Sequence, residues 1–144
     1  APSEYASENA VEEGEGRFFD DYCNWERIDE FKRIVFDSKV GKIAALAMKS
    51  RTAQFFHDHV LVKEPGSSIV TPWHQDQSYY CTSGNQTISF WIPLDSISLN
   101  NTLSCISGSH NWGKLHKPKR FDGSDLFEND NSEDVPDIDN NLDK

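Results

Sequence analysis

Turn-forming residues divide the chain between residues 52 and 107 into short stretches of β-branched and aromatic residues. Such stretches favour strands of a few residues over helices. Pro65-Gly66 and Ser83-Gly84-Asn85 predict turns, and Pro72 favours an edge strand or a bend. The expected strands are residues 52–63, 69–80, 86–95 and 103–107. A series of short strands joined by turns is typical of a β-sandwich or barrel.

Two helices are expected before these strands. Apolar residues recur at helical spacing after Asn24, a candidate cap, and again between residues 38 and 49. The predicted fold class is therefore α+β, in one domain of residues 1–144. Its expected parts are a flexible N-terminus (1–16), helices (17–51), strands (52–116) and an acidic irregular tail (117–144).

Charge is unevenly distributed along the 144 residues. The net charge is −10, and residues 121–144 alone contain nine acidic residues and one basic residue. An acidic tail argues against nucleic-acid and anionic-membrane partners. No apolar run is long enough to span a bilayer, and residues 1–16 do not resemble a signal peptide. The three cysteines lack metal-type spacing, which favours a reduced, cytoplasmic protein.

His74 and Asp76 are the strongest candidates for a metal site. On a strand, residues i and i+2 point to the same side, so both side chains can approach one ion, while Gln75 faces the other way. One more histidine would complete the set of two histidines and a carboxylate that leaves open positions on Fe(II). The pair alone is weak evidence, because His-x-Asp is common by chance.

Four segments around this pair strengthen the metal hypothesis. They are "LVKEPG" (61–66), "TPWHQDQSYY" (71–80), "SFWIPLD" (89–95) and "SGSHNWG" (107–113). In this order they resemble the phytanoyl-CoA dioxygenase family of Fe(II)- and 2-oxoglutarate-dependent oxygenases. The resemblance covers about residues 18–116, with a weaker one at 135–139. It implies a double-stranded β-helix, or cupin-like jelly roll, with N-terminal helices.

The resemblance also implies roles for individual residues. His74 and Asp76 match the first two iron ligands, and Trp91 matches an aromatic residue that lines the 2-oxoglutarate pocket. Lys63 matches a lysine near the cosubstrate carboxylate, and His57 stands where relatives often have a glutamine beside the cosubstrate. The alternatives are a core position for Trp91, a strand-end cover for Lys63 and an exposed strand face for His57.

Other matched positions carry weaker expectations. Tyr79 and Tyr80 would line the substrate entrance, His110 would be structural, and His116 would be solvated. Thr102 and Ser107 replace the family's usual glycine and proline, which affects local turn geometry more than chemistry.

The family's third iron ligand, a later histidine, has no match in this chain, and neither does the arginine that binds 2-oxoglutarate. The segment "VPDID" (135–139) resembles the loop before that histidine. With Ala1 in place of an initiator methionine, this suggests an N-terminal fragment that lacks its C-terminal strands. Exposed sheet edges would then allow self-association.

The function that follows from the resemblance is an Fe(II)- and 2-oxoglutarate-dependent dioxygenase. It would hydroxylate a small organic substrate, release succinate and CO2, and use ascorbate as a reductant. The chain itself is expected to be incomplete and inactive. A non-catalytic binding module derived from this fold is the alternative, and a cupin-like isomerase is a weaker one. The resemblance does not identify the substrate.

Overall fold

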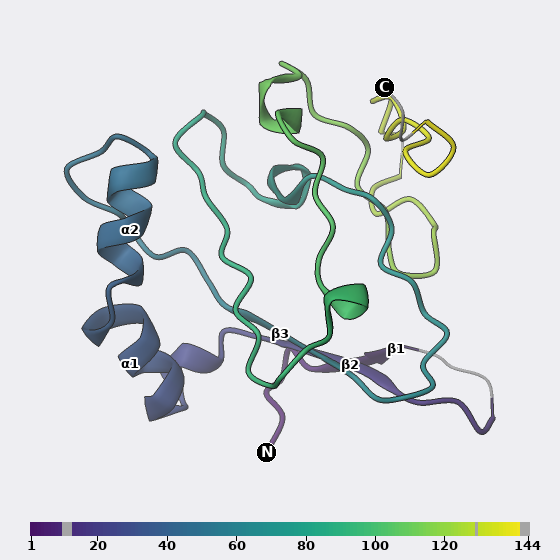
Figure 1. Ribbon diagram of the computed structural model, residues 1–144, viewed down its shortest axis with the longest axis horizontal. Helices are drawn as coiled ribbons and strands as arrows, with labels where there is room; N and C mark the ends of the chain where they lie inside the picture. Colours follow the sequence, from purple (N-terminus) through teal and green to yellow (C-terminus); the bar gives the residue numbers. More distant parts are fainter. Residues whose placement is uncertain (10–12, 129, 142–144) are drawn as a thin grey trace. The chain divides into compact units, whose positions relative to one another are not determined.

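The computed structural model describes residues 1–9, 13–128 and 130–141, and the chain forms two compact units (Figure 1). The first unit contains residues 1–72 and 119–124, and the second contains residues 73–118 and 125–144. All strands and α-helices of the described residues lie in the first unit. None of the described helices has the length and apolar character needed to cross a membrane.

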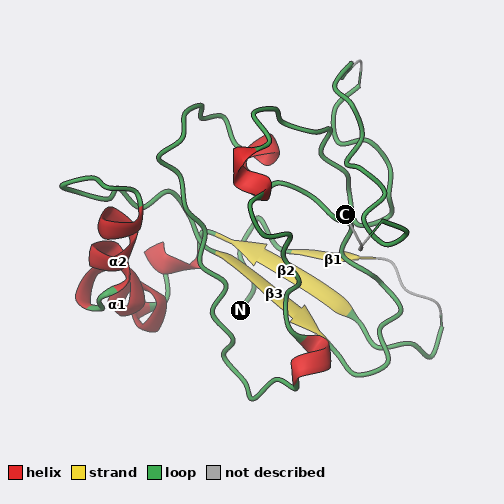
Figure 2. Ribbon diagram, turned by 45° about the horizontal axis from the view of Figure 1, so that its top comes forward, coloured by secondary structure: helices red, strands yellow, loops and turns green. Residues whose placement is uncertain are grey.

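A three-stranded antiparallel sheet organises the first unit (Figure 2). The strands are β1 (Ser7–Asn9), β2 (Phe18–Tyr22) and β3 (His59–Lys63), in the order β1-β2-β3. Phe18 pairs with Lys63, and Tyr22 pairs with His59. The central strand β2 therefore pairs with β1, which precedes it near the N-terminus, and with β3, which follows it about 40 residues later.

Buried side chains of β2 form the centre of this unit. Phe18 is 1% exposed, and its ring lies edge-on to Phe121 with centroids 4.6 Å apart. Asp20 is 4% exposed and accepts hydrogen bonds from Ser7 Oγ (2.8 Å) and Asn9 Nδ2 (3.0 Å). These bonds offset the cost of burying a carboxylate and fasten β1 to the sheet.

The chain turns sharply after β2 and enters its helical part. Cys23 has a left-handed backbone (φ 57°), and the Asp58 carboxylate accepts hydrogen bonds from the N–H groups of Asn24 (3.0 Å) and Trp25 (2.9 Å). This cap begins the 3-10 helix η1 (Asn24–Glu26), because it satisfies N–H groups that have no partner inside the helix. The helices α1 (Asp29–Asp37) and α2 (Val40–Ala47) follow, at one end of the sheet in both views (Figures 1 and 2).

The two helices predicted from periodicity are confirmed, but the predicted cap is wrong. The N-cap of α1 is Ile28, with no side-chain hydrogen bond. Asn24 cannot cap α1, because its side chain donates to Asp21 O (3.2 Å) and accepts from Arg27.

Two N-terminal segments differ from the sequence prediction. Residues 17–51 are not helical throughout, since β2 occupies Phe18–Tyr22. Residues 1–16 include strand β1, which is held by the hydrogen bonds to Asp20. Residues 10–12, 129 and 142–144 of the predicted N-terminal and tail segments lie outside the described residues.

Of the four predicted strands, only part of the first forms. Residues 52–58, 69–80, 86–95 and 103–107 contain no strand, and residues 81–100 are exposed throughout. A β-forming composition needs a neighbouring strand to make a ladder, and these stretches lack one among the described residues. The small sheet and two helices are compatible with part of a domain, but they do not themselves make a jelly roll.

The described residues of the 117–144 segment form turns and bends, without helix or strand. In the second unit, Lys117 N–H donates to Glu133 O (2.9 Å), and the Lys117 ammonium lies 3.2 Å from an Asp125 carboxylate oxygen. Lys117, at the start of this segment, thus binds two acidic residues further along it, one through the backbone and one through charge.

Gly16→Ala is expected to lower the free energy of unfolding by about 1–3 kcal/mol. A Cβ at Gly16 would lie 2.3 Å from Pro65 O and 2.8 Å from Glu64 O, which are backbone atoms that cannot rotate away. Gly41→Ala is the control: a Cβ at this position in α2 meets nothing within 4 Å. It should stabilise the chain by roughly 0.5–1 kcal/mol. Urea denaturation measures the free energy of unfolding of both variants. Changes of the same sign would contradict the close backbone approach at Gly16.

Candidate metal centre

His74 and Asp76 meet at the start of the 3-10 helix η2 (Asp76–Tyr79). His74 Nε2 lies 3.2 Å from Asp76 Oδ1, and the two side chains are 29% and 45% exposed. The prediction that the side chains converge is confirmed, but the prediction of a strand is wrong. Extended backbone at Gln75 (φ −113°, ψ 123°) is enough to bring residues i and i+2 to one side, and the turn begins immediately afterwards.

The donor set of this pair fits a divalent transition metal. An imidazole nitrogen and a carboxylate oxygen are the ligand types of the two-histidine, one-carboxylate Fe(II) sites. In the described ranges 1–9, 13–128 and 130–141, no cluster of three or more His, Cys, Asp or Glu side chains is placed to hold an ion. The geometry therefore supplies two converging ligands and leaves the rest of a coordination sphere open.

Two tyrosines border the pair. The ring of Tyr79 lies edge-on to His74, with centroids 5.5 Å apart and an interplanar angle of 84°. Burial raises the pKa of Tyr80, and the negative charge of Asp76 raises it further, while a hydrogen bond with Ser89 opposes the shift. Both phenols are thus close to the candidate ligands, and their role at a substrate entrance stays a prediction.

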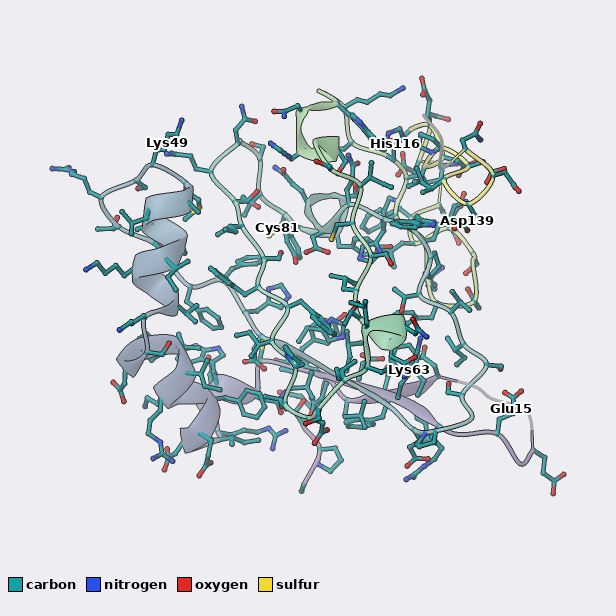
Figure 3. All side chains as sticks on the ribbon, viewed as in Figure 1. Glu15, Lys49, Lys63, Cys81, His116 and Asp139 are labelled. Carbon is teal, nitrogen blue, oxygen red and sulfur yellow. The ribbon has the colours of Figure 1, made fainter. Side chains whose placement is uncertain are left out.

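Trp73 and Gln75, the residues that alternate with the candidate ligands, bind later segments of the chain. Gln75 Nε2 donates to Lys114 O (3.2 Å), and Gln75 Oε1 accepts from His116 N–H (2.8 Å). Trp73 Nε1 donates to Asp139 Oδ1 (2.8 Å). Figure 3 labels His116 and Asp139, which come from these two later segments. The sequence indicated only that Gln75 faces away from its neighbours.

His116 is buried, so the prediction that it is solvated is wrong. It is 2% exposed, and Trp112 packs edge-on against its ring at 5.7 Å. Both ring nitrogens are buried without a hydrogen-bond partner among the described residues. The local "KLHKPK" sequence gives no sign of this burial, which results from Trp112 and from the hydrogen bond between Gln75 and the His116 backbone.

The described contacts do not join the three candidates for cosubstrate binding, which are Lys63, His57 and Trp91, in one site. Lys63 ends β3 in the first unit, where its Nζ lies 4.9 Å from the Phe18 ring centroid and burial lowers its pKa. His57 lies in the predicted strand 52–63 but precedes β3, which begins at His59, so the alternative of an exposed strand face for His57 is wrong. Trp91 is 44% exposed, and its place beside the cosubstrate stays a prediction.

Lowering the pH through about 6.5 is expected to destabilise the first unit through His59. This side chain stacks on Tyr22 (3.8 Å) and is 25% exposed, with Nε2 3.6 Å from Asp20 Oδ1. Burial lowers the pKa of His59 below its model-compound value of 6.5, although the Asp20 carboxylate opposes the shift. Because the unfolded chain then binds a proton more readily than the folded one, stability falls as the pH drops from above 6.5 toward the folded pKa.

Thermal unfolding at pH 7.5 and 5.5 measures this effect. His59→Gln should reduce the loss of melting temperature between the two pH values, and His110→Gln should leave it unchanged because residue 110 is exposed. An equal loss in wild type and His59→Gln would show that other groups cause the pH dependence.

Comparison with known proteins identifies the chain at the level of its family. The model of the phytanoyl-CoA dioxygenase family matches residues 2–141. Searches of the curated proteins and of the solved structures found no match. The match spans nearly all of the 144 residues and includes the converging His74 and Asp76. The chain therefore belongs to the phytanoyl-CoA dioxygenase family.

Proposed function

We propose that this protein is an Fe(II)- and 2-oxoglutarate-dependent dioxygenase that hydroxylates a small organic substrate. The family supports an oxygenase-type enzyme, since its members generally depend on Fe(II) and 2-oxoglutarate. The observation that carries the proposal for this chain is the 3.2 Å approach of His74 Nε2 to Asp76 Oδ1. A divalent ion held by these atoms would replace their partly exposed contact with two metal–ligand bonds.

The residues of the pair have distinct roles in this proposal. Asp76 supplies negative charge to the ion, and His74 supplies a neutral nitrogen whose ring is restrained by Tyr79 at 5.5 Å. When bound, iron and 2-oxoglutarate would supply the oxidising chemistry: one O2, one 2-oxoglutarate and one C–H bond yield an alcohol, succinate and CO2. Ascorbate would keep the iron reduced between turnovers.

Cosubstrate binding is assigned by the family resemblance. Trp91 would lie against 2-oxoglutarate, Lys63 would pair with its carboxylate, and His57 would lie beside it. Lys63 suits this role because its ammonium is partly buried, which lowers its pKa, and an anionic partner would oppose that shift. The substrate itself is a small molecule whose class this chain does not identify.

The 144 residues provide two matched protein ligands and no match for the third histidine or for the cosubstrate arginine. We therefore expect weak iron binding and little turnover by this chain. A charged hydrogen-bonded partner contributes about 2–5 kcal/mol in a binding site. Its absence should weaken 2-oxoglutarate binding by roughly 30-fold or more.

Anaerobic titration of the chain with Fe(II), followed by 2-oxoglutarate, tests the proposed function. We expect saturable Fe(II) binding that is lost in His74→Ala and retained in the control His110→Ala. Equal Fe(II) binding in wild type and His74→Ala would contradict the metal assignment. A wild-type chain that binds no Fe(II) would favour the non-catalytic module. A charge-transfer band at micromolar 2-oxoglutarate would show that other residues of this chain complete the site.

A further inference from the structure

The candidate metal ligands are not held by a sheet ladder in the part of the chain that the structure describes. Neither His74 nor Asp76 belongs to a strand, and exposure alternates along the motif: residues 74 and 76 are exposed, whereas residues 73 and 75 are partly buried. In a sheet, ladder hydrogen bonds would fix the direction of both ligand side chains. Here that task falls to the side chains between and beside them.

We propose that Gln75 is a positioning residue that sets the geometry of His74 and Asp76 for metal binding, with Trp73 as a second anchor. This inference rests on the proposed function. The inference extends the proposed function, because it assigns a supporting role to Trp73 and Gln75, the two residues that alternate with the ligands. Neither Gln75 nor Trp73 would touch the ion.

The Gln75 side-chain amide is suited to this role because both its nitrogen and its oxygen form hydrogen bonds. Its Nε2 donates to Lys114 O and its Oε1 accepts from His116 N–H, at 3.2 and 2.8 Å. Two hydrogen bonds to one backbone segment restrain rotation as well as distance, as a pair of ladder bonds does between strands. The residue thus ties the motif to residues 114–116 without removing either ligand from solvent.

The segment that Gln75 binds is itself held in place. His116 is 2% exposed and is covered by Trp112. Lys117 N–H donates to Glu133 O at 2.9 Å, and Lys114 forms an ion pair with Glu133. The buried His116 side chain, the backbone hydrogen bond of Lys117 and the ion pair of Lys114 make residues 114–117 a firm support for Gln75.

Trp73 provides an independent restraint on the other side of His74. Its Nε1 donates to Asp139 Oδ1 at 2.8 Å, within a turn where Asn141 N–H donates to Ile138 O at 3.0 Å. Because Trp73 and Gln75 bind different segments, the ligand between them is fixed at two points. The Trp73 contact is exposed, so we expect it to contribute less than Gln75.

Co(II) binding to the full chain, followed by visible absorption, tests this inference. Gln75→Ala should weaken Co(II) binding about tenfold and shift the ligand-field bands, because loss of supporting contacts to metal ligands typically lowers affinity by 10–100-fold. Gln75→Glu keeps the acceptor for His116 N–H and loses the donor to Lys114 O, so its affinity should be intermediate. Trp73→Phe keeps an aromatic ring but removes the indole N–H donor, with an expected loss of less than about fivefold.

Gln77→Ala is the matched control. Gln77 lies in the same motif, and its Nε2 donates to Gly84 O (2.9 Å), away from residues 114–116. Its Co(II) affinity and spectrum should equal those of wild type. Amide exchange at His116 provides a second readout: its N–H should lose protection in Gln75→Ala and keep it in Gln77→Ala.

The outcomes separate this inference from the proposed function. Wild-type affinity and spectrum in Gln75→Ala would overturn the positioning role and leave the metal site intact. A wild-type chain that binds no Co(II) or Fe(II) would overturn both. If Gln75→Ala does not fold, Gln75→Glu and Trp73→Phe decide, and unchanged Co(II) binding in both would overturn the inference.

Discussion

Replacing Asp76 with alanine is expected to weaken Fe(II) binding by about 30-fold or more and to abolish any succinate formation. Asp76 is the sole carboxylate in the matched ligand pair, and its Oδ1 lies 3.2 Å from His74 Nε2. Removing one partner of a charged pair in a binding site costs about 2–5 kcal/mol. The lower value, about 2 kcal/mol, suits the Asp76 side chain because it is 45% exposed. Since each 1.4 kcal/mol changes an affinity tenfold, this value corresponds to a loss of about 30-fold.

Isothermal titration without oxygen measures the affinity, and a succinate assay measures turnover. Asp76→Asn keeps the size and one oxygen donor but removes the charge, so its affinity should fall between those of wild type and Asp76→Ala. Asp95→Ala, in the all-exposed stretch 81–100, is the control and should bind as wild type does. Normal Fe(II) affinity in Asp76→Ala would show that the metal is bound elsewhere.

Phe18→Ala is expected to lower the free energy of unfolding by about 3–5 kcal/mol, the usual range for removing a buried phenylalanine. Phe18 is 1% exposed and packs edge-on against Phe121 at 4.6 Å. Among the described residues, Phe18 and Ala44 form the buried hydrophobic core. Because small domains have only about 5–15 kcal/mol of stability, this loss should remove a large share of the stability of the first unit.

Phe127→Ala is the comparison for this variant, because its side chain is 51% exposed and should change stability by less than about 0.5 kcal/mol. Urea denaturation followed by tryptophan fluorescence measures both variants, since Trp25 lies in the first unit and contacts Phe36 and Phe55. Similar losses in the two variants would contradict the assignment of Phe18 to the centre of the unit.

Local patterns in the sequence were sufficient for the helices and for the convergence of the metal pair. The apolar spacing around Ile28 and Val40 depends on residues three and four apart, and α1 and α2 form there. The i, i+2 rule needs only extended backbone at residue 75 to bring His74 and Asp76 together. Both features are decided by contacts within a few residues.

The strands and the supports of the site could not be predicted in this way. Strand β2 reads "FFDDY" and is stabilised by residues far along the chain, including Lys63 in its register and Ser7 on Asp20. Nothing near His116 indicates that Gln75, about 40 positions earlier, binds its backbone. Such pairings join residues far apart in the sequence, so they cannot be predicted from local composition or periodicity.

The alternation of exposed ligands with partly buried anchors makes the length of residues 73–76 as important as their identity. Deleting or inserting one residue within this stretch would exchange the two sides, because side chains of extended backbone alternate with a period of two. His74 would then take the place of an anchor and Gln75 that of a ligand. The exposed stretch 81–85 can therefore be expected to tolerate a change in length, whereas residues 73–76 should not tolerate a change of register.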